Sequence, residues 1–197
     1  EVPGYSLPPS VYLSPAALEI AQRGPDPLFA GGPPPLAAVP QIRVAMRQNM
    51  APKVEALRQQ YGVEVIETTV GGIHGYWVKS NRQSASGARP VLLNLSGGGF
   101  TIGQANPLGL IEAIPVAATT GYDVLTIDYA QAPEAVFPAA SDDVTAVYRA
   151  LLQSHSPGRI GIYGCSAGGL STAQALARFQ RDGLPTPGAA AVLSKNV

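Results

Sequence analysis

The spacing of hydrophobic residues changes at Gly62. Before this glycine the chain is rich in Pro and Ala and holds few β-branched residues, which favours helices over strands. Ser14 followed by Pro15 is typical of a helix N-cap and a first helical position. A second helix is expected from about 40 to 61, ended by Gly62 and kinked or split at Pro52. Residues 1–62 are therefore predicted to form a helical segment.

After Gly62 short apolar runs alternate with segments of helical spacing. The expected strands are 63–69, 74–79, 91–95, 122–128, 159–163 and 189–194, and the expected helices are 108–120, 138–154 and 167–182. Pro115 is expected to interrupt the first of these helices. Such alternation predicts an α/β fold with a mostly parallel sheet and helices on both faces. Ligands of such sheets bind beyond the carboxyl ends of the strands.

Composition narrows the class of protein. A length of 197 residues with 46% hydrophobic content suits one domain with a sizeable core. Only 13% of residues are charged, the net charge is zero and no basic stripe is present, so a nucleic-acid partner is not expected. No apolar run predicts a transmembrane helix, and no signal peptide is recognised. The single cysteine, Cys165, excludes an internal disulfide and leaves the compartment open, with the cytoplasm favoured.

The first loop with recognisable chemistry is Gly164-Cys165-Ser166-Ala167-Gly168-Gly169. It follows an expected strand and opens an expected helix, which is the context of a nucleophile elbow. The small neighbours permit a tight turn that lifts the Ser166 hydroxyl out of the sheet. The free N–H of Ala167 at the helix start can then receive an oxyanion. The alternative is a glycine-rich turn without chemistry.

The second loop, Ser96-Gly97-Gly98-Gly99-Phe100, follows the strand 91–95. Three glycines let the backbone approach a ligand and turn its amides toward it. We expect the N–H groups of Gly97 and Gly98 to complete an oxyanion hole with that of Ala167. The alternatives are a flexible turn and a phosphate-binding loop, but the Lys of a P-loop and the GxGxxG pattern are both absent.

A third stretch joins these two loops in a recognisable order: DYAQAPE at 128–134, followed by FPAA at 137–140. Together the three stretches resemble the hormone-sensitive-lipase family of α/β-hydrolases, whose motifs read HGGGF, DYRLAPE…FPAA and GDSAGG. The resemblance covers roughly residues 63–194. It implies an eight-stranded, mostly parallel sheet, a cap of N-terminal helices over the site, and hydrolysis of carboxylic esters, often with short acyl groups. Residues 1–62 would be the cap and 63–197 a truncated hydrolase core.

The sequence departs from the family pattern at three positions. Ser96 stands where the family has a His that helps to hold the glycine loop, so the oxyanion hole is expected to be looser but present. Ala130 replaces an Arg, so a structural ion pair is expected to be missing. Cys165 replaces an Asp beside the nucleophile, and we interpret it as a buried small hydrophobe rather than a reactive thiol.

Two members of the expected triad are missing. In this fold the order is Ser, then Asp or Glu, then His, so both partners should follow the strand 189–194. The only histidines, His74 and His155, are expected on the wrong side of the sheet or far from Ser166. The last two strands of the family fold are also missing, so 189–194 would be an exposed apolar edge open to a second copy or a complementing chain. The chain is therefore interpreted as part of a longer enzyme or a truncated product.

The sequence thus predicts a serine carboxylesterase that acts on a small-molecule ester through an acyl-enzyme on Ser166. No cofactor and no metal are expected. The 197-residue chain alone is expected to be inactive or nearly so. One alternative is an inactive ligand-binding protein, because plant gibberellin receptors resemble this family without hydrolysing their ligand. A truncated fragment and an amide hydrolase on the same elbow are the others.

Overall fold

The computed structural model describes residues 8–23, 35–81 and 89–193. The chain divides into two compact units, Glu1–Pro35 and Leu36–Val197. The first unit contains helix α1, Pro15–Gln22, in which the Ser14 side chain accepts a hydrogen bond from the Ala17 N–H, as its N-cap role predicts. Helix α2, Val39–Tyr61, belongs to the second unit, as the sheet does. The cap role of residues 1–62 stays a prediction.

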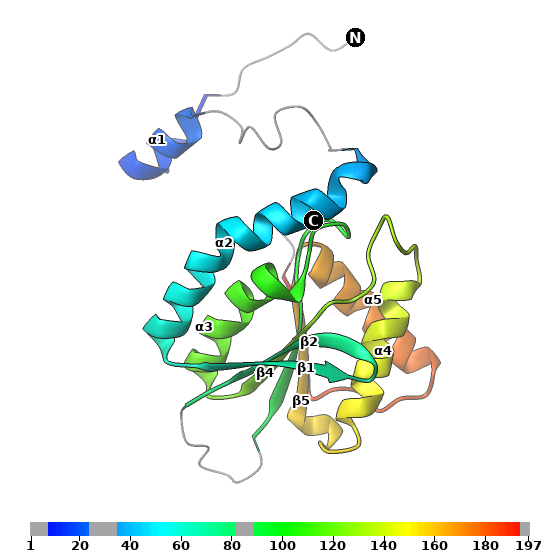
Figure 1. Cartoon of the computed structure of the whole chain (residues 1–197). Coiled ribbons are helices and arrows are strands. Elements are labelled where there is room, and N and C mark those ends of the chain that lie inside the picture. Colours follow the sequence, from blue (N-terminus) through cyan, green and yellow to red (C-terminus); the bar gives the residue numbers. More distant parts are fainter. Residues whose placement is uncertain (1–7, 24–34, 82–88, 194–197) are drawn as a thin grey trace. The chain divides into compact units, whose positions relative to one another are not determined.

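The second unit is built on one six-stranded sheet, of which Figure 1 labels β1, β2, β4 and β5. Its strands are β1 Glu64–Val70, β2 Ile73–Lys79, β3 Val91–Leu95, β4 Asp123–Ile127, β5 Ile160–Cys165 and β6 Ala189–Leu193. The order across the sheet is β1-β2-β4-β3-β5-β6. The pairs β1–β2 and β2–β4 are antiparallel, whereas β4, β3, β5 and β6 run parallel. The predicted mostly parallel sheet is confirmed.

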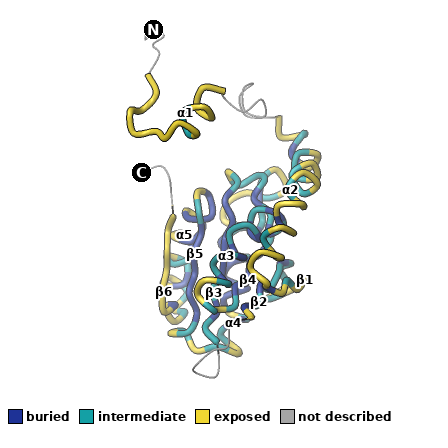
Figure 2. The backbone as a smooth tube through the Cα atoms, turned by 90° about the vertical axis from the view of Figure 1, so that its left-hand side faces the viewer, coloured by how far each residue is buried: buried dark blue, intermediate teal, exposed yellow. Residues whose placement is uncertain are grey.

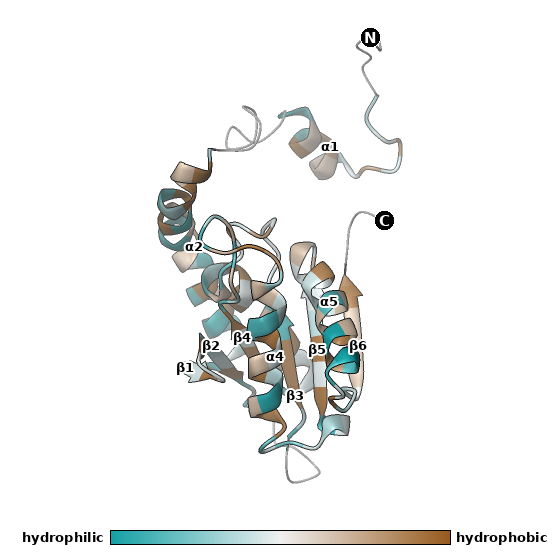
Figure 3. Cartoon of the chain, turned by 90° about the vertical axis from the view of Figure 1, so that its right-hand side faces the viewer, coloured by the Kyte–Doolittle hydropathy of each residue, from teal (hydrophilic) through white to brown (hydrophobic). Residues whose placement is uncertain are grey.

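Helices cover both faces of the sheet, as predicted (Figure 1). Helices α2 and α3, Leu110–Thr120, lie on one face, and α4, Ala139–Leu151, and α5, Ala167–Arg181, lie on the other. Tyr148 of α4 stacks on Phe179 of α5 with ring centroids 4.1 Å apart, above the central strands. Three short helical segments complete the described elements: the 3₁₀-helices Leu36–Ala38 and Pro157–Arg159 and the π-helix Ala105–Gly109. Figure 3 shows hydrophobic residues concentrated in the central strands and hydrophilic residues outward on α4 and α5.

Two helices contain an internal proline, and neither helix is interrupted by it. Helix α2 continues through Pro52 and α3 through Pro115, so the predicted interruption at Pro115 and the predicted split at Pro52 were wrong. A proline inside a helix costs about 3 kcal/mol. That cost is opposed here by the apolar face that each helix buries, because α3 places Ala113, Ile114 and Ala117 in the core.

Strand β6 forms an edge of the described sheet, and all of its residues are exposed (Figure 2). Val192 and Leu193 are 50% and 54% exposed, which agrees with the predicted apolar edge. Pairing of this edge with a further chain stays a prediction. Among the described helices, none has the length and apolarity needed to cross a membrane.

Candidate active site

The serine of the predicted elbow lies between the last residue of β5 and the first residue of α5. Ser166 has φ 55° and ψ −123°, a backbone conformation that is unusual and strained for a residue with a side chain. The glycines two positions before and after it have no room for a side chain. A Cβ at Gly164 would lie 2.3 Å from the backbone of Gly168, and a Cβ at Gly168 would lie 1.8 Å from the Leu95 oxygen. Tight packing of α5 on β3 and β5 therefore imposes the strained turn.

The glycine loop after β3 lies directly against this elbow. A Cβ at Gly97 would lie 2.9 Å from the Cys165 oxygen and 3.3 Å from Ser166 Cβ. The following backbone is in the left-handed region, with φ 130° at Gly98, 60° at Gly99 and 58° at Phe100. The structure thus brings together the two loops whose residues were predicted to act together.

Some backbone N–H groups near Ser166 donate a hydrogen bond within the protein, and others have no acceptor. The Gly97 N–H, a predicted oxyanion donor, donates to Glu112 Oε1 at 3.4 Å. Across the described part of the chain, the amides of Gly98, Gly99 and Ala167 have no hydrogen-bond acceptor. Gly98 and Ala167 therefore remain candidate donors as predicted. Gly99 replaces Gly97 as the other candidate. The sequence does not predict this exchange, because no residue pattern records how a peptide is oriented.

Buried polar side chains anchor the glycine loop. The Ser96 oxygen accepts a hydrogen bond from the Tyr129 hydroxyl at 2.6 Å. The pKa of Tyr129 is raised to about 12 by burial, so the hydroxyl stays protonated and able to donate. The side-chain amide of Gln131 pairs with both the N–H and the C=O of Gly103, which packs against Gly97. The expected loosening at Ser96 is thus opposed by anchors from the loop after β4.

Arg43 of α2 connects the segment after the glycine loop to the loop after β4. Its Nε donates to the Thr101 oxygen at 2.7 Å and its Nη2 to the Ala132 oxygen at 2.8 Å. Its Nη1 also pairs with Glu134 at 2.8 Å, and this guanidinium lowers the pKa of the Glu134 carboxyl. Glu134 thus pairs with an arginine 91 residues away in sequence. The loss of an ion pair through Ala130 stays a prediction.

Neither histidine contacts Ser166 in the described structure. His74 is the second residue of β2, and because β2 runs antiparallel to β4, it lies at the end of the sheet where the parallel strands and the elbow end. Each histidine was expected either on the wrong side of the sheet or far from Ser166, and His74 is the second case, because β4 and β3 separate its strand from β5. Its Nδ1 is 2.6 Å from Asp128 Oδ2 and its Nε2 is 2.8 Å from Glu67 Oε1. His155 precedes the amino end of β5, so it lies at the opposite end of the strands from the elbow.

The contacts of His74 predict a pH-dependent stability. Hydrogen bonds to Glu67 and then to Asp128 raise the pKa of His74 above its ordinary value, against desolvation. Because the folded pKa exceeds the unfolded one, this stabilisation is complete below about pH 6.5 and is lost as the pH rises through the folded pKa. We expect the urea concentration at the unfolding midpoint of the wild type to decrease as the pH is raised from about 6 to about 8. The decrease should be smaller in His74→Gln. An equal pH slope in both proteins would show that the His74 contacts contribute nothing.

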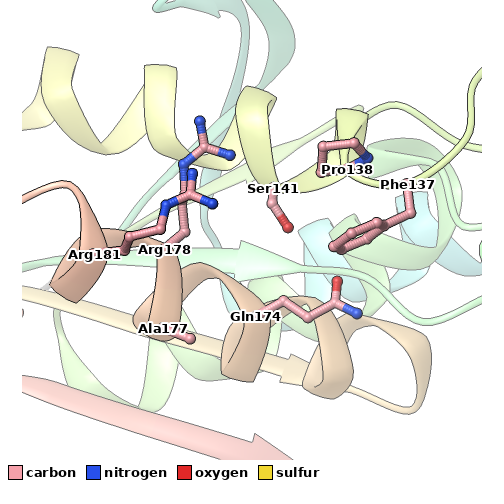
Figure 4. Close-up of a pocket in the computed structure, with 7 residues that line it drawn as sticks. All are labelled: Phe137, Pro138, Ser141, Gln174, Ala177, Arg178 and Arg181. Carbon is pink, nitrogen blue, oxygen red and sulfur yellow. The ribbon is translucent and has the colours of Figure 1, made fainter.

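Two neighbouring hollows lie along α4 and α5. One, of about 290 Å³, is bordered by Phe100, which follows the glycine loop, and by residues of the loop after β4. The other, of about 300 Å³, is shown in Figure 4, with Phe137 at one end and Arg178 and Arg181 at the other. They share Phe137 and Gln174, and Ser166 lines neither of them. Cys165 is partly buried, and no cluster of metal-ligating residues occurs within the described ranges.

A strained serine between a parallel strand and a helix, packed against a glycine loop from the neighbouring strand, defines the class of α/β-hydrolases. Residues 92–195 match the family described as having an alpha/beta hydrolase fold. The solved structure of esterase E25 superposes with a TM-score of 0.78 over 96% of this chain and 59% of that chain, at 24% identity, which supports the fold alone. A hormone-sensitive lipase from a metagenome library superposes with a TM-score of 0.65 at 33% identity, over 82% of this chain and 51% of that one.

The names of similar sequences agree with this class. The acetyl-hydrolase of Streptomyces hygroscopicus is 38% identical over 64% of this chain and 41% of its own length. The carboxylic ester hydrolase LipN of Mycobacterium tuberculosis is 32% identical over 76% of this chain and 43% of its own length. The chain belongs to the α/β-hydrolase family. Within that family it is similar to esterases of the hormone-sensitive-lipase type. It spans about half the length of the curated relatives that it matches.

Proposed function

We propose that the protein containing this chain hydrolyses small carboxylic esters, with Ser166 as the nucleophile. The main support for this proposal is the strained backbone of Ser166, together with the nearby amides of Gly98, Gly99 and Ala167, which have no hydrogen-bond acceptor. A carbonyl carbon at the Ser166 hydroxyl would place its oxygen where those amides can donate to it. The names of the relatives, an acetyl-hydrolase and a carboxylic ester hydrolase, support an ester with a short acyl group as the substrate.

The reaction proceeds in two halves. Ser166 Oγ attacks the ester carbonyl while a histidine takes its proton, and the backbone amides stabilise the negative oxygen. Collapse of the intermediate expels the alcohol, which receives the proton, and leaves an acyl-Ser166. Water, deprotonated by the same histidine, then attacks the acyl-enzyme and releases the carboxylic acid. Each step uses side chains and backbone amides alone.

The histidine and the acidic residue that orients it lie outside residues 1–197 in this proposal. His74 is held by two carboxylates and His155 lies at the opposite end of the strands, so neither can take the proton from Ser166. Without a base the serine is a weak nucleophile. Binding and the oxyanion hole alone leave about 10³–10⁴-fold acceleration over water.

A second candidate function is ligand binding without hydrolysis. It is favoured by the engagement of both histidines elsewhere, because an elbow without a base can hold an ester or an acid but turns an ester over only at a residual rate. An amide substrate on the same elbow is a third candidate. Parallel assays with matched p-nitrophenyl ester and p-nitroanilide substrates separate ester from amide turnover.

The deciding experiment compares the 197-residue chain with the complete gene product in a p-nitrophenyl acetate and butyrate assay. The intact mass of each sample establishes which polypeptide is present. We expect saturable turnover by the complete product and at most residual turnover by the chain alone. Saturable binding without turnover by the complete product would contradict the proposal and favour the ligand-binding protein. Ordinary turnover by the chain alone would place the base among its own residues.

A further inference from the structure

The peptide unit between Ser96 and Gly97 is held at both of its polar ends. Its C=O accepts the Tyr129 hydroxyl at 2.6 Å, and its N–H donates to Glu112 Oε1 at 3.4 Å. Tyr129 comes from the loop after β4 and Glu112 from α3. Neither side chain takes part in the chemistry proposed above. The two contacts together fix the plane of one peptide and fix no other part of the loop directly.

The Glu112 carboxylate is itself fixed in place. Its second oxygen accepts a hydrogen bond from Asn94 Nδ2 at 2.9 Å, and Asn94 Oδ1 accepts one from Thr126 Oγ1 at 2.8 Å. Asn94 and Thr126 are fully buried. The turn before α3 presses on this pair, because a Cβ at Gly109 would lie 2.0 Å from Thr126 Oγ1. Burial raises the pKa of Glu112, and the hydrogen bonds from Asn94 and Gly97 oppose that shift.

This peptide is the one whose orientation matters for the site. Gly97 packs on Ser166 Cβ, and the next amide along the chain is that of Gly98. The Ser96–Gly97 peptide and the Gly97–Gly98 peptide share the Gly97 Cα, so fixing the first peptide removes one of the ways in which the Gly98 amide can turn. We propose that Glu112 and Tyr129 are positioning residues that clamp this peptide and thereby aim the loop amides at the developing oxyanion. The inference rests on the proposed esterase function and deepens it.

A carboxylate suits this place because both of its neighbours are N–H donors. Glutamine has the same size but offers one acceptor and one donor, so either Asn94 or Gly97 would face a donor. Glu112→Gln therefore removes one end of the clamp at almost constant volume. Tyr129→Phe removes the other end and leaves the ring in the core.

The kinetic test uses the complete gene product with p-nitrophenyl butyrate. We expect kcat to fall about tenfold or more in Glu112→Gln and in Tyr129→Phe with little change in KM, because the misplaced amides act in the transition state. The double variant should lose less than the product of the two single losses, because both act on one peptide. Glu55→Gln, the same change at a half-exposed site on α2, should retain wild-type kcat. An unchanged kcat accompanied only by a lower melting temperature would overturn the positioning role.

A second measurement separates this inference from the proposed function. In the NMR spectrum, the Gly97 amide of the wild type should shift as Glu112 titrates, and that shift should be absent in Glu112→Gln. A Gly97 amide that ignores the titration would overturn the clamp, whatever the turnover. A titrating amide in a wild-type protein without turnover would instead refute the esterase proposal, and the catalytic role of the clamp with it.

Discussion

Replacing Ser166 with alanine is expected to lower ester turnover by the complete gene product by about 10⁴-fold or more while the fold stays intact. The hydroxyl is the only atom that the change removes. In the described structure the Ser166 side chain makes no hydrogen bond that would stabilise the fold. The strained backbone is imposed by the packing of Gly164 and Gly168, so alanine inherits the same conformation. Turnover of p-nitrophenyl butyrate and thermal unfolding measure the two effects separately.

The control for this change is Ser156→Ala, at an exposed serine whose side chain caps nothing. It should retain wild-type turnover and stability. Labelling with a fluorophosphonate, read by peptide mass spectrometry, should mark Ser166 in the wild type and in Ser156→Ala but leave Ser166→Ala unmarked. Retention of a tenth or more of the turnover in Ser166→Ala would mean that a different group attacks the ester.

The elbow could be predicted because its determinants are local. A strand, a serine between small residues and a helix start all lie within a few positions, and the packing that forbids larger residues leaves glycines in the sequence. The orientation of the glycine loop is not local. Whether Gly97 or Gly99 has a free amide depends on Glu112, 15 residues away from Gly97, and on Tyr129, 33 residues away from Ser96. No pattern in the sequence marks these contacts.

The location of His74 could not be predicted for a different reason. The strands were found close to their observed positions, but the order of strands in a sheet is not the order in the chain. Because β2 pairs antiparallel with β4, the first residues of β2 reach the end of the sheet where the parallel strands end. The same holds for Arg43, whose partners in two loops become neighbours only when α2 packs beside them.

Replacing Gly168 with alanine is expected to destabilise the protein by about 3 kcal/mol or more, although alanine is the better helix former by about 1 kcal/mol. The added Cβ would lie 1.8 Å from the Leu95 oxygen and 2.8 Å from the Ser96 oxygen, and both contacts are with backbone. A side chain could rotate away, but β3 cannot move without breaking its pairing with β4 and β5. The urea midpoint should therefore fall sharply. Any folded fraction should lose turnover by about 10²-fold, since α5 carries the Ala167 amide away from the glycine loop.

Gly158 supplies the matched control for this prediction. It lies in the turn Pro157–Arg159, with no atom within 4 Å of an added Cβ, and its backbone is not left-handed. Gly158→Ala restricts the unfolded chain without a clash, so stability should be unchanged or raised by up to about 1 kcal/mol. The two substitutions add the same methyl group, and only the distance to the neighbouring backbone differs. If Gly168→Ala unfolded at the same urea concentration as Gly158→Ala, helix α5 would have to lie farther from β3 than the structure places it, and the elbow would lose the packing that strains Ser166.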